Sequence, residues 1–402
     1  MKKYYQHPAV VLGLGAGGLD AVRSLGKQGI EVYGIFTRED EAGRFSRYCS
    51  SLLFPPIKPD SNLFLERLIG FAKNIQKKAV LIPATDEFVN FICKYREILV
   101  EYFLFQIPDG DFIEKLLNKA YMVQLASKHS LEIPQTFFCN DVNSIQHIAE
   151  AINYPCIIKP LNSFSISFQS KNIIIKDKQS FIDVFKNHTE YIGNCLVQEF
   201  IEGGDNLICQ FNAYFDSESR PLSIVTIKKN RQYPPNRGIG SYITTEELPQ
   251  LRALSLSFLK SINYKGIASL EFKMNPKTGQ YFFIEINPRI PWYHRICSDS
   301  GNSLALTAYL DLTGRNIKKD SIIHQINEVR WIDFGNDLGS FIRKFLRGEI
   351  TFHAWIVSVF KANSFAFWDS KDTLPFFYMA WSLLISSTKA FLRFFRTGKI
   401  LS

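Results

Sequence analysis

The sequence lacks the marks of several large protein classes. Its 402 residues include only seven cysteines, an odd number, which are widely scattered and never spaced as Cys-x-x-Cys. This usage excludes a secreted scaffold held by disulfides, gives no support to a zinc site, and fits reduced thiols. The N-terminal segment is basic but has no separate apolar stretch followed by a small-residue cleavage site, so we expect no signal peptide. We therefore expect a cytoplasmic protein.

A clear membrane-spanning run is also lacking. Residues 373–388 carry no charge, but they fall short of the roughly 18–20 residues that a spanning helix needs, and Pro375 stands near their start. Basic residues without any acid follow this segment: Lys389, Arg393, Arg396 and Lys399. A helix packed on the rest of the protein fits this pattern. Peripheral contact of residues 373–402 with the acidic inner face of a membrane fits it too.

The surplus of positive charge needs an explanation. Lys and Arg number 47 against 38 Asp and Glu, a formal net charge of +9, and 46% hydrophobic residues are enough to bury a core. Nucleic acid, an acidic membrane surface or an anionic small ligand would each suit this surplus. Because the basic residues form no dense cluster and no nucleic-acid-binding motif is present, we expect no nucleic-acid partner.

The expected elements change in character along the chain. Strands at Ala9–Leu14, Glu31–Phe36 and Ala79–Ile82 alternate with helices, which indicates a parallel, doubly wound α/β sheet. A helix capped by Asn118 is expected from Lys119 to Ser130. Strands joined by tight turns then predominate, which indicates an α+β region: Pro155–Lys159, Asn172–Lys176, Cys195–Phe200, Leu207–Phe215, Leu222–Lys228, Gly266–Met274 and Gln280–Ile286.

A glycine loop follows the first strand. Residues 13–18, Gly-Leu-Gly-Ala-Gly-Gly, match G-x-G-x-x-G and open a helix, an arrangement that suits the pyrophosphate of a dinucleotide. The full fingerprint also needs an acidic residue at the end of the second strand, and Arg38 stands there instead. Arg38 could receive a 2′-phosphate, which leaves NADP open. Alternatively, the glycines only permit a tight turn with close packing.

Two lysines and an acidic crossover are candidates for nucleotide contact. Lys119 starts a helix, and Lys159 closes an apolar strand just before a proline, which suits a cation directed into a cleft. Residues 196–205 run from a buried strand into a polar crossover whose backbone groups could bond a purine edge, with Asp205 placed to meet ribose hydroxyls. Solvated lysines and an ordinary acidic hairpin loop are the alternatives.

A later hairpin gathers two acids and an amide. Strand alternation places Glu285 and Asn287 on one face, and Glu271 on the first strand is expected opposite Phe283, diagonal to Glu285. Carboxylates this close destabilise a sheet unless a cation compensates, and Mg²⁺ prefers such oxygens together with substrate phosphates. Arg289, just beyond, is placed to meet phosphate oxygens bidentately. The alternative is a solvated strand, which the Glu-Ile-Asn-Pro-Arg combination disfavours.

Taken in this order, the motifs resemble the ATP-grasp superfamily of carboxylate–amine ligases, of the D-aspartate ligase and carbamoyl-phosphate synthase large-chain type, over roughly residues 8–315. The resemblance implies four units along the chain: a Rossmann-like domain before the ATP-grasp over 1–108, a first lobe over 109–195, a second lobe with the metal site over 196–315, and a helical C-terminal extension over 316–402. It also implies ATP and Mg²⁺, or Mn²⁺, as cofactors. In this family the glycine loop shapes the substrate side rather than binding NAD.

The resemblance also assigns roles to the candidate residues. It implies that Lys119 and Lys159 contact the phosphates, that Gln198, Glu199, Phe200 and Ile201 form the adenine hinge, mostly through backbone, and that Asp205 holds the ribose. Metal ligation falls to Glu271, Glu285 and Asn287, and support of the phosphoryl and acyl-phosphate groups to Arg289. One departure is residues 161–171, which contain no glycine where many members have a glycine-rich phosphate lid, so serines or Lys171 would have to substitute.

Weaker candidates lie around this set. The basic segment 228–238 is expected to be a flexible loop that could bring a cation to phosphate or to a substrate carboxylate. These substrate candidates are Lys228, Arg231, Arg237 and His294. A solvated loop and a structural histidine are the alternatives.

The predicted function is ADP-forming ligation, in which a carboxylate is activated as an acyl phosphate and joined to an amine. Candidate substrates are an amino acid, a peptide, or a cell-wall or surface-polysaccharide precursor. Two alternatives stay open: an NAD(P)-dependent oxidoreductase built on the glycine loop, and a non-catalytic nucleotide-binding protein associated with a membrane. The sequence does not indicate an oligomeric state.

Overall fold

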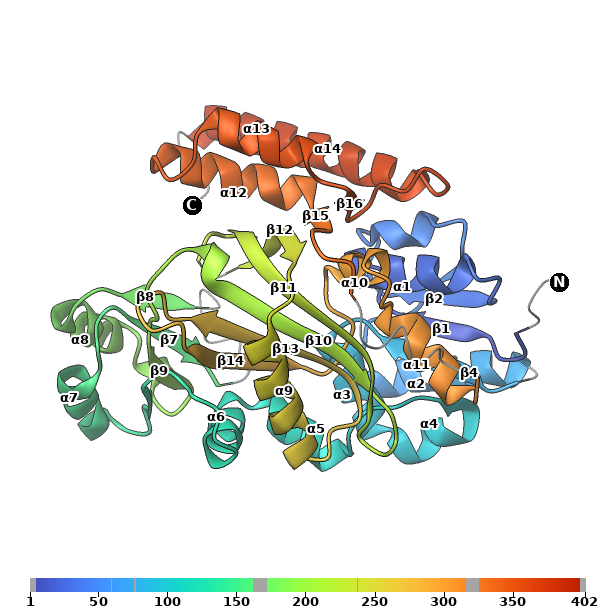
Figure 1. Ribbon diagram of the computed structural model, residues 1–402, viewed down its shortest axis with the longest axis horizontal. Coiled ribbons are helices and arrows are strands. Elements are labelled where there is room, and N and C mark those ends of the chain that lie inside the picture. The colour runs from blue at the N-terminus through green and yellow to red at the C-terminus, as the bar shows by residue number, and fades with distance from the viewer. Residues whose placement is uncertain are drawn as a thin grey trace.

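The computed structural model describes residues 5–58, 60–75, 77–161, 172–236, 238–315 and 325–397, with the backbone alone at 114, 117 and 386–397. Strands in these ranges form sheets of five, four and seven strands, and helices near the C-terminus lie across one side of the molecule (Figure 1). A parallel sheet comes first in the chain and mainly antiparallel sheets follow, so the expected fold class is confirmed.

The five-stranded sheet is parallel throughout, in the order β3-β2-β1-β4-β5. Its strands are β1 (Ala9–Leu12), β2 (Val32–Phe36), β3 (Ser50–Leu53), β4 (Ala79–Pro83) and β5 (Phe103–Leu104). The helices of this domain are α1 (Ala16–Gly26), α2 (Ser61–Asn74), α3 (Asp86–Lys94) and α4 (Arg96–Tyr102). Because β1 and β4 are parallel neighbours, the glycine loop after β1 and Asp86 after β4 come out at the same edge of the sheet.

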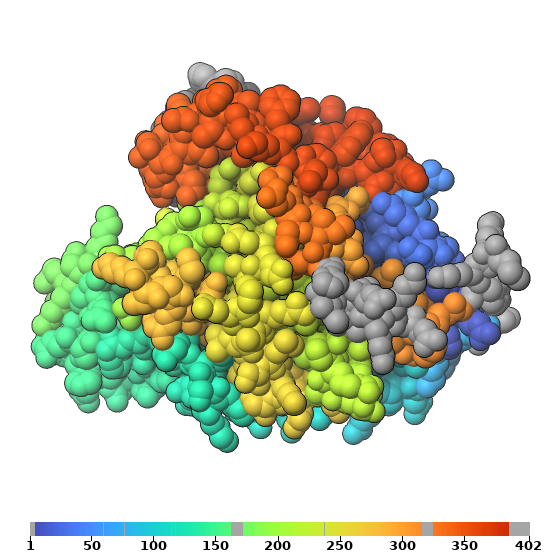
Figure 2. Space-filling view, in the orientation of Figure 1, coloured from blue at the N-terminus to red at the C-terminus, as the bar shows by residue number. Residues whose placement is uncertain are grey.

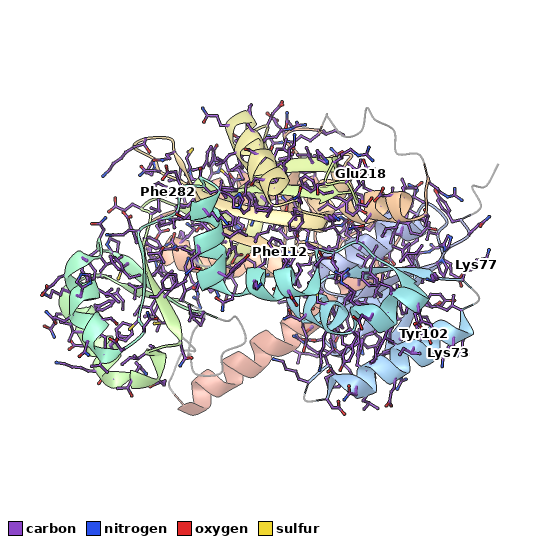
Figure 3. The ribbon with its side chains drawn as sticks, turned by 90° about the horizontal axis from the view of Figure 1, so that it is seen from below. Lys73, Lys77, Tyr102, Phe112, Glu218 and Phe282 are labelled. Carbon is purple, nitrogen blue, oxygen red and sulfur yellow. The ribbon has the colours of Figure 1, made fainter. Side chains whose placement is uncertain are left out.

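The four-stranded sheet has the order β6-β9-β7-β8 and is antiparallel. Its strands are β6 (Thr136–Phe138), β7 (Cys156–Pro160), β8 (Ile173–Ile175) and β9 (Cys195–Glu199), and its helices are α7 (Val142–Ala151) and α8 (Lys178–Asn187). Before it come α5 (Gly110–Leu117) and α6 (Lys119–Lys128). The expected Asn118 cap is confirmed, since its side chain accepts from the Ala120 N–H at 2.9 Å. Figure 3, seen from below, shows α5, which carries Phe112, crossing between the N-terminal sheet and the seven-stranded sheet.

The seven-stranded sheet has the order β14-β13-β10-β11-β12-β15-β16. Its strands are β10 (Ile208–Phe215), β11 (Pro221–Tyr233), β12 (Ile239–Thr245), β13 (Gly266–Met274), β14 (Tyr281–Asn287), β15 (Arg330–Ile332) and β16 (Ser364–Phe365). The accompanying helices are α9 (Pro249–Ser261), α10 (His294–Asp299) and α11 (Leu304–Leu312).

The basic segment expected as a flexible loop is mostly strand. β11 continues to Tyr233, five residues beyond the expected end at Lys228, and it pairs with β12, which the sequence analysis missed. The polar run was misleading because irregular pairing between Lys229 and Arg231 changes the alternation of side chains, and because Arg231 is buried with an acidic partner.

Three helices, α12 (Phe334–Leu346), α13 (Phe352–Phe360) and α14 (Leu374–Thr397), form what we call the C-terminal layer, which lies at the top of Figure 1. Arg23 of α1 fixes its position, since the guanidinium is buried, lies 2.9 Å from Asp372, and donates to the Phe367 carbonyl at 2.8 Å. Within the described part of the chain, no helix has the length and apolar character required to span a bilayer.

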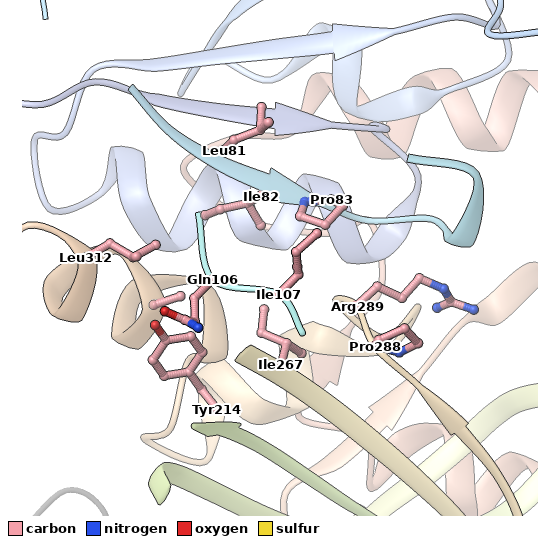
Figure 4. Close-up of a pocket in the computed structure, with 11 residues that line it drawn as sticks. Leu81, Ile82, Pro83, Gln106, Ile107, Tyr214, Ile267, Pro288, Arg289 and Leu312 are labelled. Atoms are coloured by element: carbon pink, nitrogen blue, oxygen red, sulfur yellow. The ribbon is translucent and has the colours of Figure 1, made fainter. Parts of the chain in front are cut away.

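The hydrophobic core joins the predicted domains. One cluster of buried side chains combines β1 and α1 residues such as Val11 and Leu19 with Ile227 and Trp331 of the seven-stranded sheet. A small cavity of about 20 Å³, enough for roughly one water, lies at this junction between β4 and the ends of β10 and β13 (Figure 4). The expected boundaries at 108, 195 and 315 stay a prediction.

Candidate functional site

A cavity of about 610 Å³ lies between the four-stranded and seven-stranded sheets and reaches the carboxyl edge of the N-terminal sheet. Its lining brings together most of the candidate residues: Lys119, Lys159, Gln198, Glu199, Phe200, Ile201, Glu271, Glu285, Asn287 and Arg289. These come from α6, β7, β9, β13, β14 and the segments next to them. Residues more than 150 positions apart in the chain therefore share one cavity.

The two lysines meet at the β7 side of the cavity. Lys159 Nζ donates to Gln198 Oε1 at 2.8 Å, and Gln198 is in turn held by Thr136 at 2.9 Å. Lys119 Nζ donates to the Pro160 carbonyl at 3.0 Å. Burial lowers the pKa of Lys159 to about 8, although Glu285 acts against this shift. An anionic ligand in the cavity would stabilise the charged form of Lys159.

The acidic hairpin has a different register from the expected one. Glu271 pairs directly with Glu285 across β13 and β14, while Phe283 pairs with Phe272. Two shifts of one residue add up: Met274 already pairs with Tyr281, one residue off the expected register, and a bulge between Glu271 and Phe272 leaves Ile284 outside the pairing. The expected diagonal arrangement is therefore wrong, and the two carboxylates lie closer along the strands than the diagonal would place them.

The close carboxylates have partners of opposite charge or polarity. Lys229 Nζ lies 2.6 Å from Glu271, which also accepts from Gln210, and Asn287 Nδ2 donates to Glu285 at 3.0 Å. Lys229 and Gln210 were not among the site residues predicted from the sequence. In the described part of the chain, no three His, Cys, Asp or Glu residues cluster closely enough to hold a metal by themselves.

Arg289 also lines the cavity and is ion-paired. Its Nε and Nη2 donate to the two carboxylate oxygens of Asp86 at 2.7 and 3.1 Å, and Nη2 lies 3.3 Å from Asn287 Oδ1. Asp86, at the start of α3, was also missed as a candidate. Its signal was a polar Thr-Asp pair at the end of an apolar strand, where parallel sheets commonly place ligand-binding residues.

The predicted hinge differs in detail from the expectation. The N–H groups of Glu199 and Phe200 donate to the carbonyls of Gln135 and Pro155 at 2.8 and 3.0 Å. A purine edge would therefore meet other backbone groups of residues 198–201.

The structure contradicts the expectation that Asp205 meets the ribose. Its side chain is buried outside the cavity lining, accepts from the Gln232 and Asn236 N–H groups, and lies 3.0 Å from Lys344. Residues 203–205 form a closed turn rather than the open crossover that the glycines suggested: Lys273 Nζ donates to the carbonyls of Gly203 and Gly204 at 2.9 and 2.8 Å.

Three of the weaker substrate candidates are not among the residues that line the cavity: Lys228, Arg231 and His294. Lys228 lies on the other face of β11 and pairs loosely with Glu246 at 3.8 Å, because its neighbour Lys229 takes the cavity side. Arg231 is buried in a bidentate pair with Asp337, at 2.7 and 2.9 Å.

His294 is completely buried. Its Nδ1 lies 2.7 Å from Asp20, and its Nε2 accepts from the Ala305 N–H at 3.3 Å. Burial acts to raise the pKa of Asp20, but His294 and Arg295 lower it below its usual value, so this pair ties α1 to α10. Arg237 and residues 162–171, including Lys171, lie outside the described residues.

The glycine loop packs tightly instead of standing open. A Cβ on Gly17 would lie 2.3 Å from the Pro291 carbonyl oxygen, and one on Gly18 would lie 1.9 Å from that of Gly13. The N–H of Leu14 donates to the Glu41 carboxylate, which also lies 3.3 Å from the Thr37 N–H. A carboxylate at these N–H groups disfavours a pyrophosphate, so the packing interpretation of the loop fits better than the dinucleotide one.

Comparisons with protein-family models match two consecutive parts of the chain. Residues 117–211 match the RimK-like ATP-grasp domain, and residues 239–309 match the ATP-binding domain of the carbamoyl-phosphate synthase L chain. Among curated proteins, a D-aspartate ligase of Enterococcus faecium is 26% identical over 262 residues, which cover 61% of this chain and 62% of that protein. An arginine-specific carbamoyl phosphate synthase large chain of Bacillus subtilis is 24% identical over 44% of this chain and 18% of its own length. The chain thus spans about three-fifths of the first relative and less than a fifth of the second.

Solved structures share the fold at lower identity. The biotin carboxylase domain of a Hydrogenobacter thermophilus 2-oxoglutarate carboxylase, crystallised with MgADP and bicarbonate, superposes with a TM-score of 0.62 at 18% identity, over 80% of this chain and 73% of that one. An N5-carboxyaminoimidazole synthetase from Staphylococcus aureus gives 0.61 at 14% identity, over 79% and 80% of the two chains.

Proposed function

The chain carries an ATP-grasp domain, as its motifs suggested, and from this we propose that it is an ATP- and Mg²⁺-dependent ligase that joins a carboxylate to an amine. The observation that carries the proposal is the gathering of Lys159, the Glu271–Glu285 pair and Arg289 around one cavity. Phosphoryl transfer asks a protein mainly for positioning and charge neutralisation, and these side chains offer both.

The nucleotide is proposed to lie between β7 and β13. Lys119 and Lys159 would neutralise its phosphates, and backbone groups within residues 198–201 would meet the adenine. Lys273 also lines this part of the cavity and is a further cation near the nucleotide. Burial lowers its pKa to about 8, as it does for Lys159.

The residues present suit Mg²⁺, or Mn²⁺, bound together with ATP. Glu271, Glu285 and Asn287 supply hard oxygen atoms, and the lack of any three-residue acidic or histidine cluster in the described residues fits an ion that takes its other ligands from phosphates and water. Such an ion would neutralise charge on the transferring phosphoryl group. The Lys229 ammonium, 2.6 Å from Glu271, offsets the repulsion between the two acids.

The reaction we propose has two steps. A carboxylate oxygen of the substrate attacks the γ-phosphorus, the bond to the β-phosphate oxygen breaks, and ADP leaves. The amine nitrogen then attacks the acyl carbon of the acyl phosphate, the carbon–oxygen bond breaks, and inorganic phosphate leaves as the nitrogen loses a proton. Arg289, held by Asp86 in the cavity wall, would orient the carboxylate and the acyl phosphate.

Candidate substrates are an amino acid, a peptide, or a cell-wall or surface-polysaccharide precursor. The D-aspartate ligase relative supports the amino-acid option, and the Asp86–Arg289 pair offers opposite charges for the two ends of such a molecule. These partners are all small molecules or precursors with a free carboxylate or amine.

Product analysis tests the proposal. Purified protein would be screened with ATP, Mg²⁺ and paired carboxylates and amines, and the nucleotide products would be separated. We expect ADP and phosphate in equal amounts, released only when a carboxylate is present, and an amide product by mass spectrometry. AMP with pyrophosphate would contradict the acyl-phosphate route.

A further inference from the structure

Helix α12 buries mainly polar side chains, whereas an ordinary surface helix buries its apolar face. Its buried face carries Asp337, Ser340 and Lys344, at i, i+3 and i+7, together with Phe341, and the three polar groups face the seven-stranded sheet. Asp337 binds Arg231 and accepts from Trp355 at 2.9 Å, and Lys344 lies 3.0 Å from Asp205. A helix that buries its charges in this way leaves another kind of surface to the outside.

The outer face of α12 is an apolar stripe. Four large side chains repeat at i, i+4, i+8 and i+11 and are each between 38% and 50% exposed: Phe334, Leu338, Ile342 and Phe345. Leu346, next to the last of them, is more exposed still. The stripe is covered only in part: Phe334 packs against Trp355 of α13, with ring centroids 6.4 Å apart, and the exposed part of each of the four side chains faces solvent.

The two neighbouring helices also expose large apolar side chains. α13 packs on α12, with the rings of Trp355 and Phe341 stacked 4.3 Å apart, yet Phe352 and Phe360 at its ends stand outside. α14 exposes its own helical stripe: Leu374, Phe377, Trp381 and Leu384. The three helices lie together as the C-terminal layer at the top of Figures 1 and 2, so exposed apolar side chains are gathered on this layer.

The charges around this surface have one predominant sign. The exposed charged side chains of residues 334–385 include Arg347, Lys361 and Lys371, and Glu349 is the exposed acid in this range. The other acids of the range, Asp337, Asp369 and Asp372, are buried and paired with basic residues of the body. In sequence, the chain continues through Lys389, Arg393, Arg396 and Lys399 and has no acid after Asp372.

We propose that the C-terminal layer docks on the surface of an anionic lipid bilayer and lies in the interface without spanning it. Its aromatic and aliphatic side chains would enter the boundary between headgroups and acyl chains, and its basic residues would meet the lipid headgroups. A second copy of the chain suits the surface less well, because a symmetric contact would bring these like charges together. This inference does not depend on the proposed ligation reaction.

The position of the layer links it to the cavity. Asp333, which caps α12, accepts from the Trp292 indole N–H at 3.0 Å, and the Arg343 guanidinium lies over the Tyr233 ring. Trp292 and Tyr233 both line the cavity. A docked protein would therefore hold its substrate cavity behind the membrane-facing helices, close to the lipid surface.

Vesicle flotation of the full chain tests the proposal. We expect binding to vesicles that contain phosphatidylglycerol, weaker binding to vesicles of phosphatidylcholine alone, and a decrease with added salt. Replacing Leu346, Phe360 and Trp381, which are 79%, 84% and 64% exposed, together by Glu should lower the partition coefficient at least about tenfold. Leu63→Glu and Val142→Glu, at exposed apolar positions outside the layer, are matched controls that should bind like the parent chain.

Thermal unfolding and light scattering distinguish a loss of membrane binding from a loss of folding or a change of oligomeric state. The thermal unfolding midpoint should be unchanged in the triple variant, because the three replaced side chains are exposed. If the triple variant does not fold, the three single variants would be tested instead. Light scattering after gel filtration reports the oligomeric state. If the intact chain fails to float, if the controls lose binding equally, or if the parent is a dimer that the triple variant breaks without lipid, the proposal is overturned.

Discussion

Two parts of the molecule carry sequence patterns associated with phosphate binding. One is the glycine loop at residues 13–18, and the other is the hairpin of β13 and β14, whose carboxylates would act through a metal ion. In the loop, the Leu14 N–H is taken by Glu41, and the glycines pack against Pro291 and against the loop's own backbone. In the hairpin, Glu271 and Glu285 face a cavity of about 610 Å³ that also holds Lys159. The comparison teaches that a phosphate-binding pattern indicates a site only where open space lies beside it.

The largest effect should follow a change in the hairpin. Glu285→Gln keeps the shape of the side chain but removes a charge that a magnesium–nucleotide complex needs. We expect the rate of ATP-dependent ligation to fall about 100- to 1,000-fold. Steady-state ADP release measures this. Glu41→Gln is the matched change at the glycine loop, and an equal loss there would reverse the comparison.

A change in the loop should instead reduce stability. Gly18→Ala places a Cβ 1.9 Å from the Gly13 carbonyl oxygen, a backbone atom that cannot move away cheaply. The free energy of unfolding should decrease by about 2–3 kcal/mol, as for an overpacked core. Urea unfolding measures it, with Gly70→Ala in α2 as control, since a Cβ there has no neighbour within 4 Å. Equal midpoints for the two variants would refute the structural role of the loop.

The Asp86–Arg289 pair joins the start of α3 to the segment after the hairpin and should respond to geometry. Arg289→Lys keeps the charge but loses the bidentate bonds of 2.7 and 3.1 Å to Asp86. We expect kcat to fall about 10- to 100-fold with a smaller change in the KM for ATP, because the side chain is proposed to act on the carboxylate end. A change confined to the KM for ATP would place Arg289 at the nucleotide instead.

The smallest expected effect is a pH dependence of ATP affinity. Burial lowers the pKa of Lys159 to about 8, so the ammonium that attracts phosphates is present at pH 7 and is progressively lost as the pH rises through 8. The affinity for ATP should weaken by up to about tenfold between pH 7 and pH 9. Calorimetric titration checks this. In Lys159→Arg, whose guanidinium stays charged, most of the dependence should disappear, leaving the share that Lys273 contributes.

Local sequence patterns predicted much of the fold and site, whereas long-range pairing was not predictable. Apolar strands and the Asn118 cap depend on neighbours in the chain, and the cap forms as expected. The Glu-Ile-Asn-Pro-Arg motif lies at the cavity, but its strand pairs in a different register from the expected one. The choice of Lys229 over Lys228 was not predictable because residues 223–227, just before them in β11, are buried on both faces of the strand, so no alternation of exposure marks the cavity side.

The partners of buried charged residues could not be predicted from the sequence either. Arg231 and Asp205 looked like ligand contacts because the acids and lysines that neutralise them, Asp337 and Lys344, lie about a hundred residues or more further along the chain. The Asp86–Arg289 pair, 203 positions apart, was missed for the same reason. The roles of the site residues stay predictions that the variants above would test.

Nucleotide titration tests the central claim most directly. The parent chain, Glu285→Gln and Glu41→Gln would each be titrated with ATP in the presence of Mg²⁺, and with NADH and NADPH. We predict that the parent and Glu41→Gln bind ATP with Mg²⁺, that Glu285→Gln binds it at least about tenfold more weakly, and that none binds either dinucleotide. Binding of NADPH that is lost in Glu41→Gln, without binding of ATP, would contradict the account.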